Sequence, residues 1–322
     1  MSVKYSVLEM LKNAEIISGE IMAKELGVSR NSIWKAINSL RKDGYIIKAN
    51  TKSGYNLSSF TDVLCPDSIK TLCNFKDIDV YVYDSIESTN TLLKEWAKNG
   101  KAHATVLIAK EQTAGKGRLG RKFSSPANTG IYISILLRPR FSVEEALSIT
   151  TSAAVAVAKT LEEVSNKETK IKWVNDIFID DKKVCGILTE ASIDFETASL
   201  EYAVLGVGIN LFKPKNDFDD EIKSIAGAVF EGECKEEIKT KTVALFIDKF
   251  FEIYKNLPEN NYISEYRKRS YLTGKEVSIK VHDKTENGKV LDIDDKANLV
   301  VQLENGKIKA FSAGEALLKK NK

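Results

Sequence analysis

The sequence predicts an α+β protein in three parts: a winged helix-turn-helix, a mixed α/β region and a small all-β region. Three observations lead to this expectation. Short capped helical segments fill the N-terminal part, a glycine-rich loop separates two apolar strand segments near the middle, and short segments of alternating hydrophobicity end the chain. A chain of 322 residues has room for several domains, because a single hydrophobic core usually stops growing at about 250 to 300 residues.

The N-terminal part holds two capped helices joined by a tight turn. Ser18 is placed to cap a helix over residues 19–26, and Gly27 is placed to end it. Ser29 then caps a second helix, and two short helices joined in this way form a helix-turn-helix. The apolar residues that share one face are Val7, Leu8 and Leu11 of a preceding helix over 3–11, and Ile33, Ile37 and Leu40 of the second helix.

The second helix and the segment after it have the chemistry of a DNA-binding surface. Residues 45–57 predict a two-stranded ribbon with a lysine at its tip, which is a wing suited to the DNA backbone. Residues 1–60 carry nine lysines and arginines against five acidic residues, a net charge of +4, whereas the rest of the chain has a net charge of −1. An oligomerisation module with a solvated basic face is the alternative, but the fold, the wing and the local charge together favour DNA. The candidate DNA-binding residues are Ser29, Arg30, Asn31, Ser32, Lys35 and Lys52.

A polar segment over 58–66 reads as a linker, and the glycine-rich loop lies beyond it, after a predicted strand over 105–110. The glycine spacing in this loop, Gly115-x-Gly117-x-x-Gly120, matches a dinucleotide-binding turn. Such a turn must open into a helix, but here a cluster of strand- and helix-breaking residues leads into another strand over 131–137, so that interpretation is excluded.

The loop is not a Walker A phosphate loop either, because Arg-Lys-Phe follows its last glycine. What remains is a cationic loop that can approach and cover a phosphate-bearing substrate. A solvated surface loop is the alternative. The cationic residues of the loop are Lys116, Arg118, Arg121 and Lys122.

Two apolar strands over 177–179 and 184–188 are predicted to flank a turn over 180–183. Asp176, just before the first strand, is of the type that holds a magnesium ion. Lys183, at the start of the second, is suited to a carboxylate or a phosphate. An ordinary hairpin with turn-forming aspartate and lysine residues would explain the same pattern, so both interpretations stay open here.

Two further segments suit a binding site. Ser88 or Thr89 is placed to cap a helix that ends at Gly100. Residues 205–211 form a strand of small residues that includes Asn210, where a ligand could lie against the backbone.

Several classes of protein are not favoured by the composition. The four cysteines are scattered without a CxxC pair, and neither histidine has a partner at metal-ligand spacing, which argues against a zinc site, a disulfide framework and imidazole catalysis. There is no long apolar run and no leader pattern. We therefore expect a cytoplasmic protein with no membrane contact.

The C-terminal part has four short segments of alternating hydrophobicity after residue 273. Asn287–Gly288 and Asn305–Gly306 are typical hairpin dipeptides. The pattern predicts a small SH3-like barrel. The alternative to a binding role for this region is a purely structural one, as a folding cap.

Taken in order, these segments resemble the biotin protein ligases that also act as biotin operon repressors. The matching segments are the winged helix, ESTN at 87–90, GKGRLGRKF at 115–123, KWVNDIFIDDKKVCGIL at 172–188, GVGIN at 206–210 and the C-terminal β region. The resemblance spans nearly the whole chain. It implies a DNA-binding domain over 1–60, a catalytic domain over 67–271 like class II synthetases and lipoate ligases, and an SH3-like domain over 272–322.

The activity implied by the resemblance has two steps. Biotin and ATP, with Mg²⁺, give biotinyl-5′-AMP, and a specific lysine of the biotin carboxyl carrier protein of acetyl-CoA carboxylase, or of another biotin-dependent carboxylase, then takes the biotin. Biotinyl-5′-AMP would also act as corepressor, by favouring a homodimer that binds operator DNA.

The resemblance also implies roles for individual residues. Lys183 would bond the biotin carboxylate, Arg118 would retain the adenylate, and Asp176 would organise the magnesium ion. The implied biotin-binding residues are Ser88, Thr89, Asn90, Gln112, Gly115, Lys116, Gly117, Arg118, Lys183 and Gly186. The implied ATP-binding residues are Arg118, Arg121, Lys172, Asn175, Asp176, Asn210 and Ile225.

The chain departs from the family pattern at four positions. Lys116 and Leu119 replace arginines of the loop, and Lys116 keeps the charge but not the bidentate fork, so weaker retention of the adenylate is expected. Val174 replaces a proline, which puts the position of Asp176 in question, and Phe123 replaces a tryptophan.

Two other functions stay open: a biotin-sensing DNA-binding regulator without catalysis, and a lipoate or octanoate ligase. The presence of both Lys183 and Asp176 argues against the first. The winged helix combined with this loop argues against the second.

Overall fold

The computed structural model describes residues 2–50, 53–57, 64–139, 142, 145–194, 196, 199–232, 238–257, 259, 261–281 and 284–319. The chain divides into two compact units, one of Met1–Lys76 with Glu233–Ala244 and one of Asp77–Gly232 with Leu245–Lys322. The division falls within helix α7 (Ile238–Tyr254). Within the described ranges, no helix is long and apolar enough to cross a membrane.

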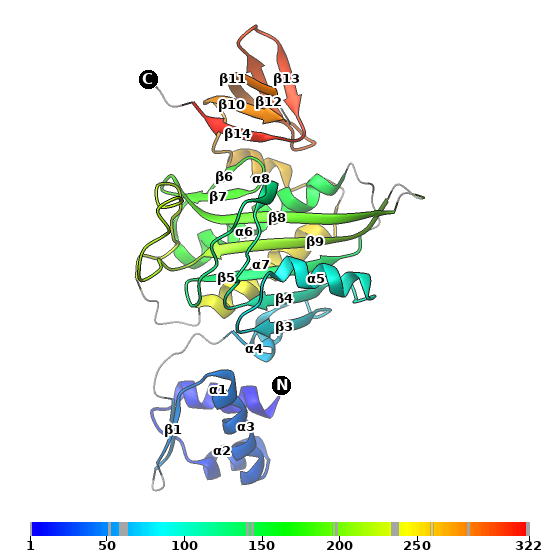
Figure 1. The fold of residues 1–322 in the computed structure, drawn as a ribbon. Coiled ribbons are helices and arrows are strands. Elements are labelled where there is room, and N and C mark those ends of the chain that lie inside the picture. Colours follow the sequence, from blue (N-terminus) through cyan, green and yellow to red (C-terminus); the bar gives the residue numbers. More distant parts are fainter. Residues whose placement is uncertain are drawn as a thin grey trace. The chain divides into compact units, whose positions relative to one another are not determined.

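The predicted helix-turn-helix is confirmed in the first unit (Figure 1). The Ser18 hydroxyl accepts a hydrogen bond from the Ile21 amide at 3.1 Å, and Gly27 ends the helix with a φ of 63°. The Ser29 hydroxyl caps the next helix by accepting from the Ser32 amide at 3.1 Å. The helices are α1 (Val3–Asn13), α2 (Gly19–Leu26), α3 (Arg30–Asp43) and α4 (Pro66–Leu72).

The wing follows α3 as the antiparallel pair β1 (Ile47–Asn50) and β2 (Gly54–Leu57). Its base is tied to the helices, because the Ile17 amide donates to the Tyr55 carbonyl at 2.9 Å. The predicted tip residue Lys52 lies outside the described residues. The core of the unit is built from the predicted apolar faces, with Val7, Leu8, Leu11, Ile33, Ile37 and Leu40 buried.

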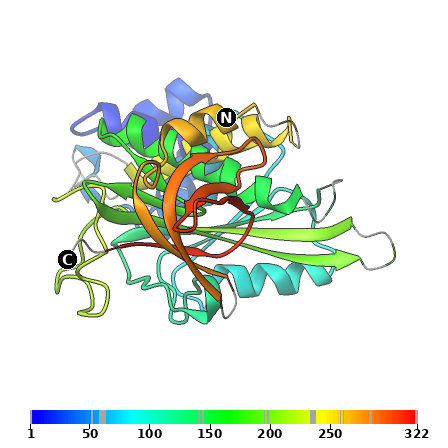
Figure 2. The ribbon, with the colours of Figure 1, turned by 90° about the horizontal axis from the view of Figure 1, so that it is seen from above.

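A seven-stranded mixed sheet organises the second unit, in the order β3-β4-β5-β9-β8-β7-β6. Only the β3–β4 pair is parallel. Figure 2 shows α5 (Thr89–Lys98) on one side of this sheet and α6 (Ala146–Ser165) on the other. The strands are β3 (Asp79–Tyr83), β4 (Thr105–Ala109), β5 (Gly130–Leu137), β6 (Lys170–Lys172), β7 (Asp176–Ile179), β8 (Lys182–Asp194) and β9 (Ser199–Asn210).

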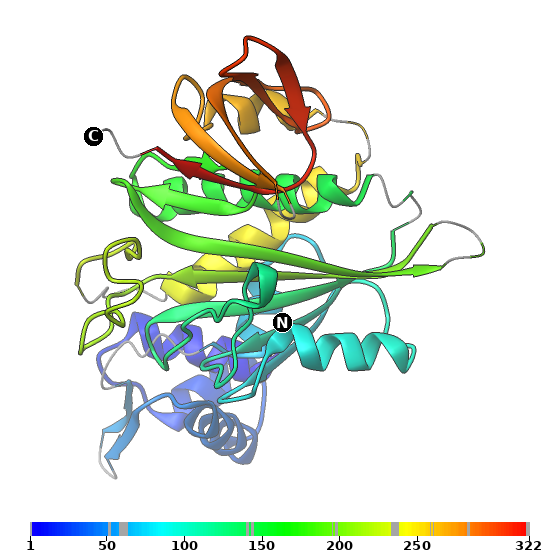
Figure 3. The ribbon, with the colours of Figure 1, turned by 45° about the horizontal axis from the view of Figure 1, so that its top comes forward.

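The structure confirms that the glycine-rich loop is not a dinucleotide-binding turn. The loop joins the antiparallel strands β4 and β5, and its one helical element is the short 3₁₀ turn Arg118–Gly120. The β8–β9 hairpin is longer than the apolar pattern predicts, and Figure 3 shows it reaching past the other strands. Residues 190–194 alternate between half-buried and exposed positions, so a search for apolar runs stops before them.

The C-terminal part is a five-stranded antiparallel sheet in the order β13-β12-β11-β10-β14, and Figure 2 shows it curled. One predicted turn is wrong. Asn287–Gly288 lies inside a strand, where a Cβ on Gly288 would come within 2.3 Å of the Gln302 carbonyl oxygen, so the glycine permits close approach of two strands. Asn305–Gly306 does form the β12–β13 turn, with a φ of 80° at Gly306. The strands are β10 (Glu276–Val281), β11 (Lys284–Ile293), β12 (Leu299–Leu303), β13 (Ile308–Phe311) and β14 (Glu315–Leu318).

An ion pair ties α6 to the end of helix α8 (Ile263–Lys268). The Arg269 guanidinium donates to Glu162 Oε1 at 3.0 Å and to Glu162 Oε2 at 2.8 Å. Burial acts to raise the pKa of Glu162, but the hydrogen bonds from Arg269 and Thr169 prevail and lower it.

The Glu162→Gln variant should therefore lose about 1 to 2 kcal/mol of unfolding free energy at neutral pH. A carboxylate whose pKa is lowered by folding contributes stability above its ordinary pKa and loses it as the pH falls through the folded value. The difference between variant and wild type should thus shrink below about pH 4.5 in urea denaturation series. The neighbouring Glu163→Gln, which breaks a half-exposed pair with Lys249, is the control and should change little. A Glu162→Gln deficit that stays constant with pH would contradict the assignment.

Candidate active site

A cavity of about 420 Å³ opens beside the glycine-rich loop in the second unit. Its wall is formed by the start of α5, the loop, strands β7, β8 and β9, and strand β14 of the C-terminal sheet. Nearly all of the site residues predicted for this unit line it. They are Ser88, Thr89, Asn90, Gln112, Lys116, Gly117, Arg118, Arg121, Lys172, Asn175, Asp176, Lys183, Gly186, Asn210 and Ile225.

Gly115 is the predicted residue that does not line the cavity. A Cβ at this position would come within 2.4 Å of the Phe123 carbonyl oxygen and 2.7 Å of Ser125 Oγ. The Phe123 amide donates to the Gly115 carbonyl at 2.9 Å, so the two arms of the loop pack against each other here. Gly115 therefore contributes to the shape of the loop and not to the cavity wall, at a position where only glycine fits.

One end of the cavity is lined by neutral polar groups that are held in place by one another. The Gln112 side-chain carbonyl accepts from the Thr89 amide at 2.8 Å and from the Thr89 hydroxyl at 3.0 Å. Gln112 Nε2 donates to Ser125 Oγ at 3.0 Å, and the Ser134 hydroxyl lies 2.7 Å from that of Thr89. Because these groups are fixed before any ligand arrives, the end of the cavity is suited to a neutral polar ring.

Asn90 braces this end, because protein groups use both ends of its side chain. Its Oδ1 accepts from Ser134 Oγ at 2.6 Å, and its Nδ2 donates to Glu190 Oε2 at 2.9 Å and to the Leu188 carbonyl at 3.3 Å. Glu190 is ion-paired to Lys94. Burial acts to raise the pKa of Glu190, but the hydrogen bonds from Lys94 and Asn90 outweigh it and lower the pKa.

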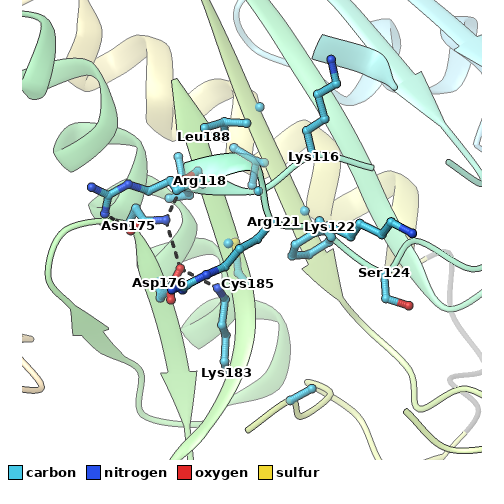
Figure 4. A pocket seen from close by; sticks show the side chains of 18 of the residues that line it. Lys116, Arg118, Arg121, Lys122, Ser124, Asn175, Asp176, Lys183, Cys185 and Leu188 are labelled. Atoms are coloured by element: carbon cyan, nitrogen blue, oxygen red, sulfur yellow. Dashed lines mark hydrogen bonds and ion pairs between the residues drawn. The ribbon is translucent and has the colours of Figure 1, made fainter. Parts of the chain in front are cut away.

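The other end of the cavity is charged. Lys183 Nζ lies 2.8 Å from Asp176 Oδ1, and Asn175 Nδ2 donates to the same carboxylate oxygen at 3.1 Å. Arg118 Nη1 donates to Asn175 Oδ1 at 3.0 Å. Figure 4 shows these four side chains as one connected group, with Lys116 pointing away from it.

The position of Asp176 is set by strand pairing. Asp176 begins β7, where it pairs with Lys172 of β6 on one side and with Gly186 of β8 on the other. The preceding Trp173–Val174 peptide bond is cis. The strands thus hold Asp176 in register even though valine stands at the position next to Trp173.

The cavity wall as a whole has a strong excess of positive charge. Six cationic side chains and two carboxylates line the cavity. Burial lowers the pKa of Lys172, and the nearby Lys183 and Arg121 act in the same direction while Asp176 opposes them. An anionic ligand would relieve this repulsion. The cationic residues are Lys116, Arg118, Arg121, Lys122, Lys172 and Lys183, and the carboxylates are Asp176 and Glu315.

The C-terminal sheet completes the site. Arg121 donates to the two oxygens of Glu315 at 2.5 and 2.8 Å, and these hydrogen bonds lower the pKa of Glu315. Arg118 Nη2 donates to the Gly314 carbonyl at 3.1 Å. Glu315 was missed by sequence reasoning, because it lies 194 residues from its partner and no local pattern marks it.

Two glycines on β9 make room for side chains of the site. A Cβ on Gly206 would come within 2.2 Å of Asn90 Oδ1, and a Cβ on Gly208 within 2.3 Å of the Phe123 ring. Sequence reasoning expected a ligand against this backbone, and both glycines do line the cavity, where they also lie against Asn90 and Phe123. Alternate small residues on one face of a strand were the available signal for this close packing.

Asn210 and Ile225 also line the cavity. Asn210 Nδ2 donates to the Gly227 carbonyl at 3.1 Å, and the Lys183 amide donates to the Ile225 carbonyl at 2.8 Å. The Ile225 side chain is 54% exposed, so it offers an uncovered apolar surface for a flat ring.

The cavity offers a magnesium ion at most two carboxylates, Asp176, which pairs with Lys183, and Glu315, which both guanidinium nitrogens of Arg121 hold. No group of three or more His, Cys, Asp or Glu side chains able to hold a metal occurs in the described part of the chain. Mg²⁺ in phosphate-handling sites is often held by one or two carboxylates together with substrate phosphates. The donor set at Asp176 therefore fits an ion that arrives with a nucleotide, and does not fit a resident metal.

The described cysteines do not serve as nucleophiles. Cys65, Cys73 and Cys185 are buried, as expected for structural thiols. Cys185 lies in the cavity wall, and its burial raises the pKa of its thiol, which disfavours the reactive thiolate. Cys234 lies outside the described residues.

The candidate DNA-binding residues gather at the start of α3 in the first unit. Arg30, Asn31 and Lys35 are exposed. Ser29 and Ser32 differ from the others, since their hydroxyls lie 2.9 Å apart and Ser29 also caps the helix.

Three family models match successive parts of the chain. Residues 4–56 match the HTH domain, residues 82–210 match the Biotin/lipoate A/B protein ligase family, and residues 272–319 match the Biotin protein ligase C terminal domain. The family models thus follow the order in which the structure presents the helix-turn-helix, the mixed sheet and the small antiparallel sheet.

Similarity to individual proteins extends over almost the whole chain. The chain is 31% identical to the Bifunctional ligase/repressor BirA of Bacillus subtilis, over 97% of this chain and 98% of that protein. It is 28% identical to the Bifunctional ligase/repressor BirA of Escherichia coli, over 99% of this chain and 98% of that protein.

A solved structure gives the same assignment for the fold. The biotin protein ligase from Aquifex aeolicus in complex with biotin and ATP superposes with a TM-score of 0.61 at 26% identity, covering 76% of this chain and 99% of that one. The chain therefore belongs to the bifunctional ligase/repressor branch of the Biotin/lipoate A/B protein ligase family.

Proposed function

We propose that this protein is an ATP-dependent biotin protein ligase that also represses transcription when biotinyl-5′-AMP accumulates. The observation that carries the proposal is a single cavity with a fixed neutral polar end and a strongly cationic end. Biotin has a neutral ureido ring at one end and a carboxylate at the other, and ATP brings further negative charge. Thr89 and Gln112 would contact the ring, together with Ser88 at the helix cap.

In the first step, a biotin carboxylate oxygen attacks the α-phosphorus of ATP, and the bond from that phosphorus to pyrophosphate breaks. Two anions must approach each other, so fixed cations are needed where charge develops. Lys183 would hold the biotin carboxylate, with Arg118, Arg121 and Lys172 facing the phosphates. Asp176 would hold a magnesium ion, and that ion would supply further neutralisation of the phosphate charge.

In the second step, the amine of a lysine on the acceptor protein attacks the acyl carbon of the adenylate. An amide bond forms, the bond between the acyl carbon and the phosphate oxygen breaks, and AMP leaves while the amine loses a proton. The adenylate must be shielded from water until then, and the loop that carries Lys116, Gly117 and Arg118, all of which line the cavity, would cover it. The acceptor would be the biotin carboxyl carrier protein of acetyl-CoA carboxylase or of another biotin-dependent carboxylase.

The repressor activity would use the first unit. Arg30, Asn31 and Lys35 on α3 are of the types that reach phosphates and base edges, and a homodimer would place two such helices on a palindromic operator. The proposed division is a DNA-binding domain over 1–60, a catalytic domain over 67–271 and a C-terminal domain over 272–322, in a cytoplasmic protein.

A comparison of biotin and lipoate as substrates tests the ligase proposal against its alternatives. The protein is incubated with ATP, magnesium and either biotin or lipoate, each with the matching carrier domain, and the product is identified by mass spectrometry. Biotin attached to its carrier supports the proposal. Transfer of lipoate or octanoate alone would identify a lipoate-type ligase, and biotin binding with neither adenylate nor transfer would identify a sensor without catalysis.

The Arg118→Gly variant should release the adenylate prematurely. Its guanidinium joins the loop to Asn175 and Gly314, so the variant loses both a ligand contact and the tether that closes the loop. We expect labelling of bystander lysines on serum albumin to rise about tenfold or more, measured by streptavidin blot. Lys110→Ala, which removes a lysine that pairs with the exposed Asp84 and does not line the cavity, is the control and should leave that labelling near the wild-type level. Unchanged background labelling in Arg118→Gly would count against this role.

A further inference from the structure

One large apolar side chain in the first unit is exposed on the helix that carries the candidate DNA-binding residues. Trp34 of α3 is 54% exposed, whereas Trp173 is 4% exposed and donates its indole N–H to the Ala297 carbonyl at 2.9 Å. Trp96 is partly buried and packs edge-on against Tyr81, with ring centroids 4.9 Å apart. Trp34 is the one exposed residue among the three tryptophans, all of which lie in the described part of the chain.

The core of the first unit is complete without Trp34. The buried residues of α3 are Ile33, Ala36, Ile37 and Leu40, and Trp34 is not part of the apolar cluster that they form. An exposed indole forgoes the hydrophobic stabilisation that burial would provide. A position that needed only to be soluble would favour a polar residue.

The neighbours of Trp34 on the exposed face are cationic and polar. Residues four apart in a helix lie side by side, so Trp34 adjoins Arg30, and Lys35 adjoins Asn31. All four are exposed. The face therefore combines one flat apolar group with two positive charges, within a segment whose net charge is +4 over residues 1–60.

This combination fits the major groove of DNA better than a membrane or a protein surface. The charges of Arg30 and Lys35 suit the phosphates that border the groove. The floor of the groove has one apolar group, the C5-methyl of thymine. Resting on the repressor function proposed above, we propose that Trp34 contacts a thymine methyl group in each operator half-site and so contributes to sequence selection.

The proposed contact differs from a phosphate contact in a measurable way. A phosphate contact releases a counterion, so its loss lowers the salt dependence of binding by about one unit of slope per contact. An apolar contact to a methyl group releases no counterion. Trp34→Ala should therefore weaken binding without changing the salt slope, whereas Lys35→Ala should reduce the slope.

The experiment uses the full-length protein with biotin, ATP and magnesium. Duplexes are enriched from a random-sequence library by the wild-type protein, and the best one is resynthesised with deoxyuridine in place of thymine, which removes only the methyl groups. We expect wild-type binding to fall at least about three- to fivefold on this exchange, in line with burial of one methyl group. Trp34→Ala should bind the thymine duplex about tenfold or more weakly and should no longer distinguish the two duplexes.

Two variants guard against loss of folding and against a general apolar effect. Trp34→Phe keeps an apolar ring and should retain most of the discrimination, and Ile16→Ala removes a side chain that is 48% exposed outside α3 and should change nothing. Equal wild-type affinity for both duplexes, or wild-type affinity in Trp34→Ala, would overturn the contact while leaving the repressor function intact. A wild-type protein that enriches no duplex overturns the repressor function and this contact together. Ligase activity of each variant, measured in parallel, is expected to be unchanged.

Discussion

Replacing Lys183 with alanine should lower the rate of biotinyl-5′-AMP formation at least about a hundredfold, with a much smaller change in biotin affinity. Fixed positive charge at a site where negative charge develops is commonly worth about 100- to 1,000-fold in rate. In the present structure Lys183 Nζ lies 2.8 Å from Asp176 Oδ1, so its removal also leaves that carboxylate facing the incoming anions. Pyrophosphate exchange reports the first step, and calorimetry with biotin reports the affinity.

The neighbouring lysine supplies a matched control. Lys182 is exposed, lies outside the cavity wall, and donates to the Ser224 carbonyl at 2.8 Å. Lys182→Ala should exchange pyrophosphate at close to the wild-type rate, and Lys183→Arg should recover part of the activity because it keeps the charge. Wild-type exchange in Lys183→Ala would remove this residue from the chemistry.

Deleting residues 1–60 should abolish operator binding while adenylate formation continues. The helix-turn-helix and the wing lie in the deleted segment, whereas every residue that lines the cavity lies between Ser88 and Leu317, within the second unit. Gel shifts with biotin and ATP measure DNA binding, and pyrophosphate exchange measures the ligase reaction.

The truncation could damage the rest of the chain, because Cys65 packs on the core that the deletion removes. A double substitution in the full-length protein controls for this effect. Arg30→Ala combined with Lys35→Ala keeps that core and should weaken DNA binding strongly with normal exchange. If the truncated protein still shifted operator DNA, the DNA-binding surface would have to lie elsewhere in the chain.

The parts of this protein that sequence predicts best are those decided by short-range interactions. Ser18, Gly27 and Ser29 act on amides and carbonyls within one helical turn, so they mark the helix-turn-helix without any knowledge of distant residues. The same reasoning excluded a dinucleotide-binding turn, because a strand follows the glycine-rich loop where a helix is required.

The prediction of which residues share one site depended on the resemblance to a family. Local pattern allowed Asp176 and Lys183 to be an ordinary hairpin, and only the ordered set of motifs favoured a shared site. The structure brings Asp176, Lys183 and Arg118 to one cavity. Arg118 lies on the glycine-rich loop, and it reaches the other two through a hydrogen bond to Asn175, which is 57 positions away in the sequence.

The tertiary structure alone decided features that depend on distant partners. Asn287–Gly288 has the composition of a turn, yet pairing with β12 keeps it inside a strand. Glu315 lies in the site because it binds Arg121, which is 194 positions away in the sequence. Gly115 does not line the cavity, because it packs against Phe123 and Ser125. The sequence by itself determined the local elements, the placement of positive charge and the family. Which side chains meet was settled by the folded chain, because their contacts gain free energy only after distant strands have paired.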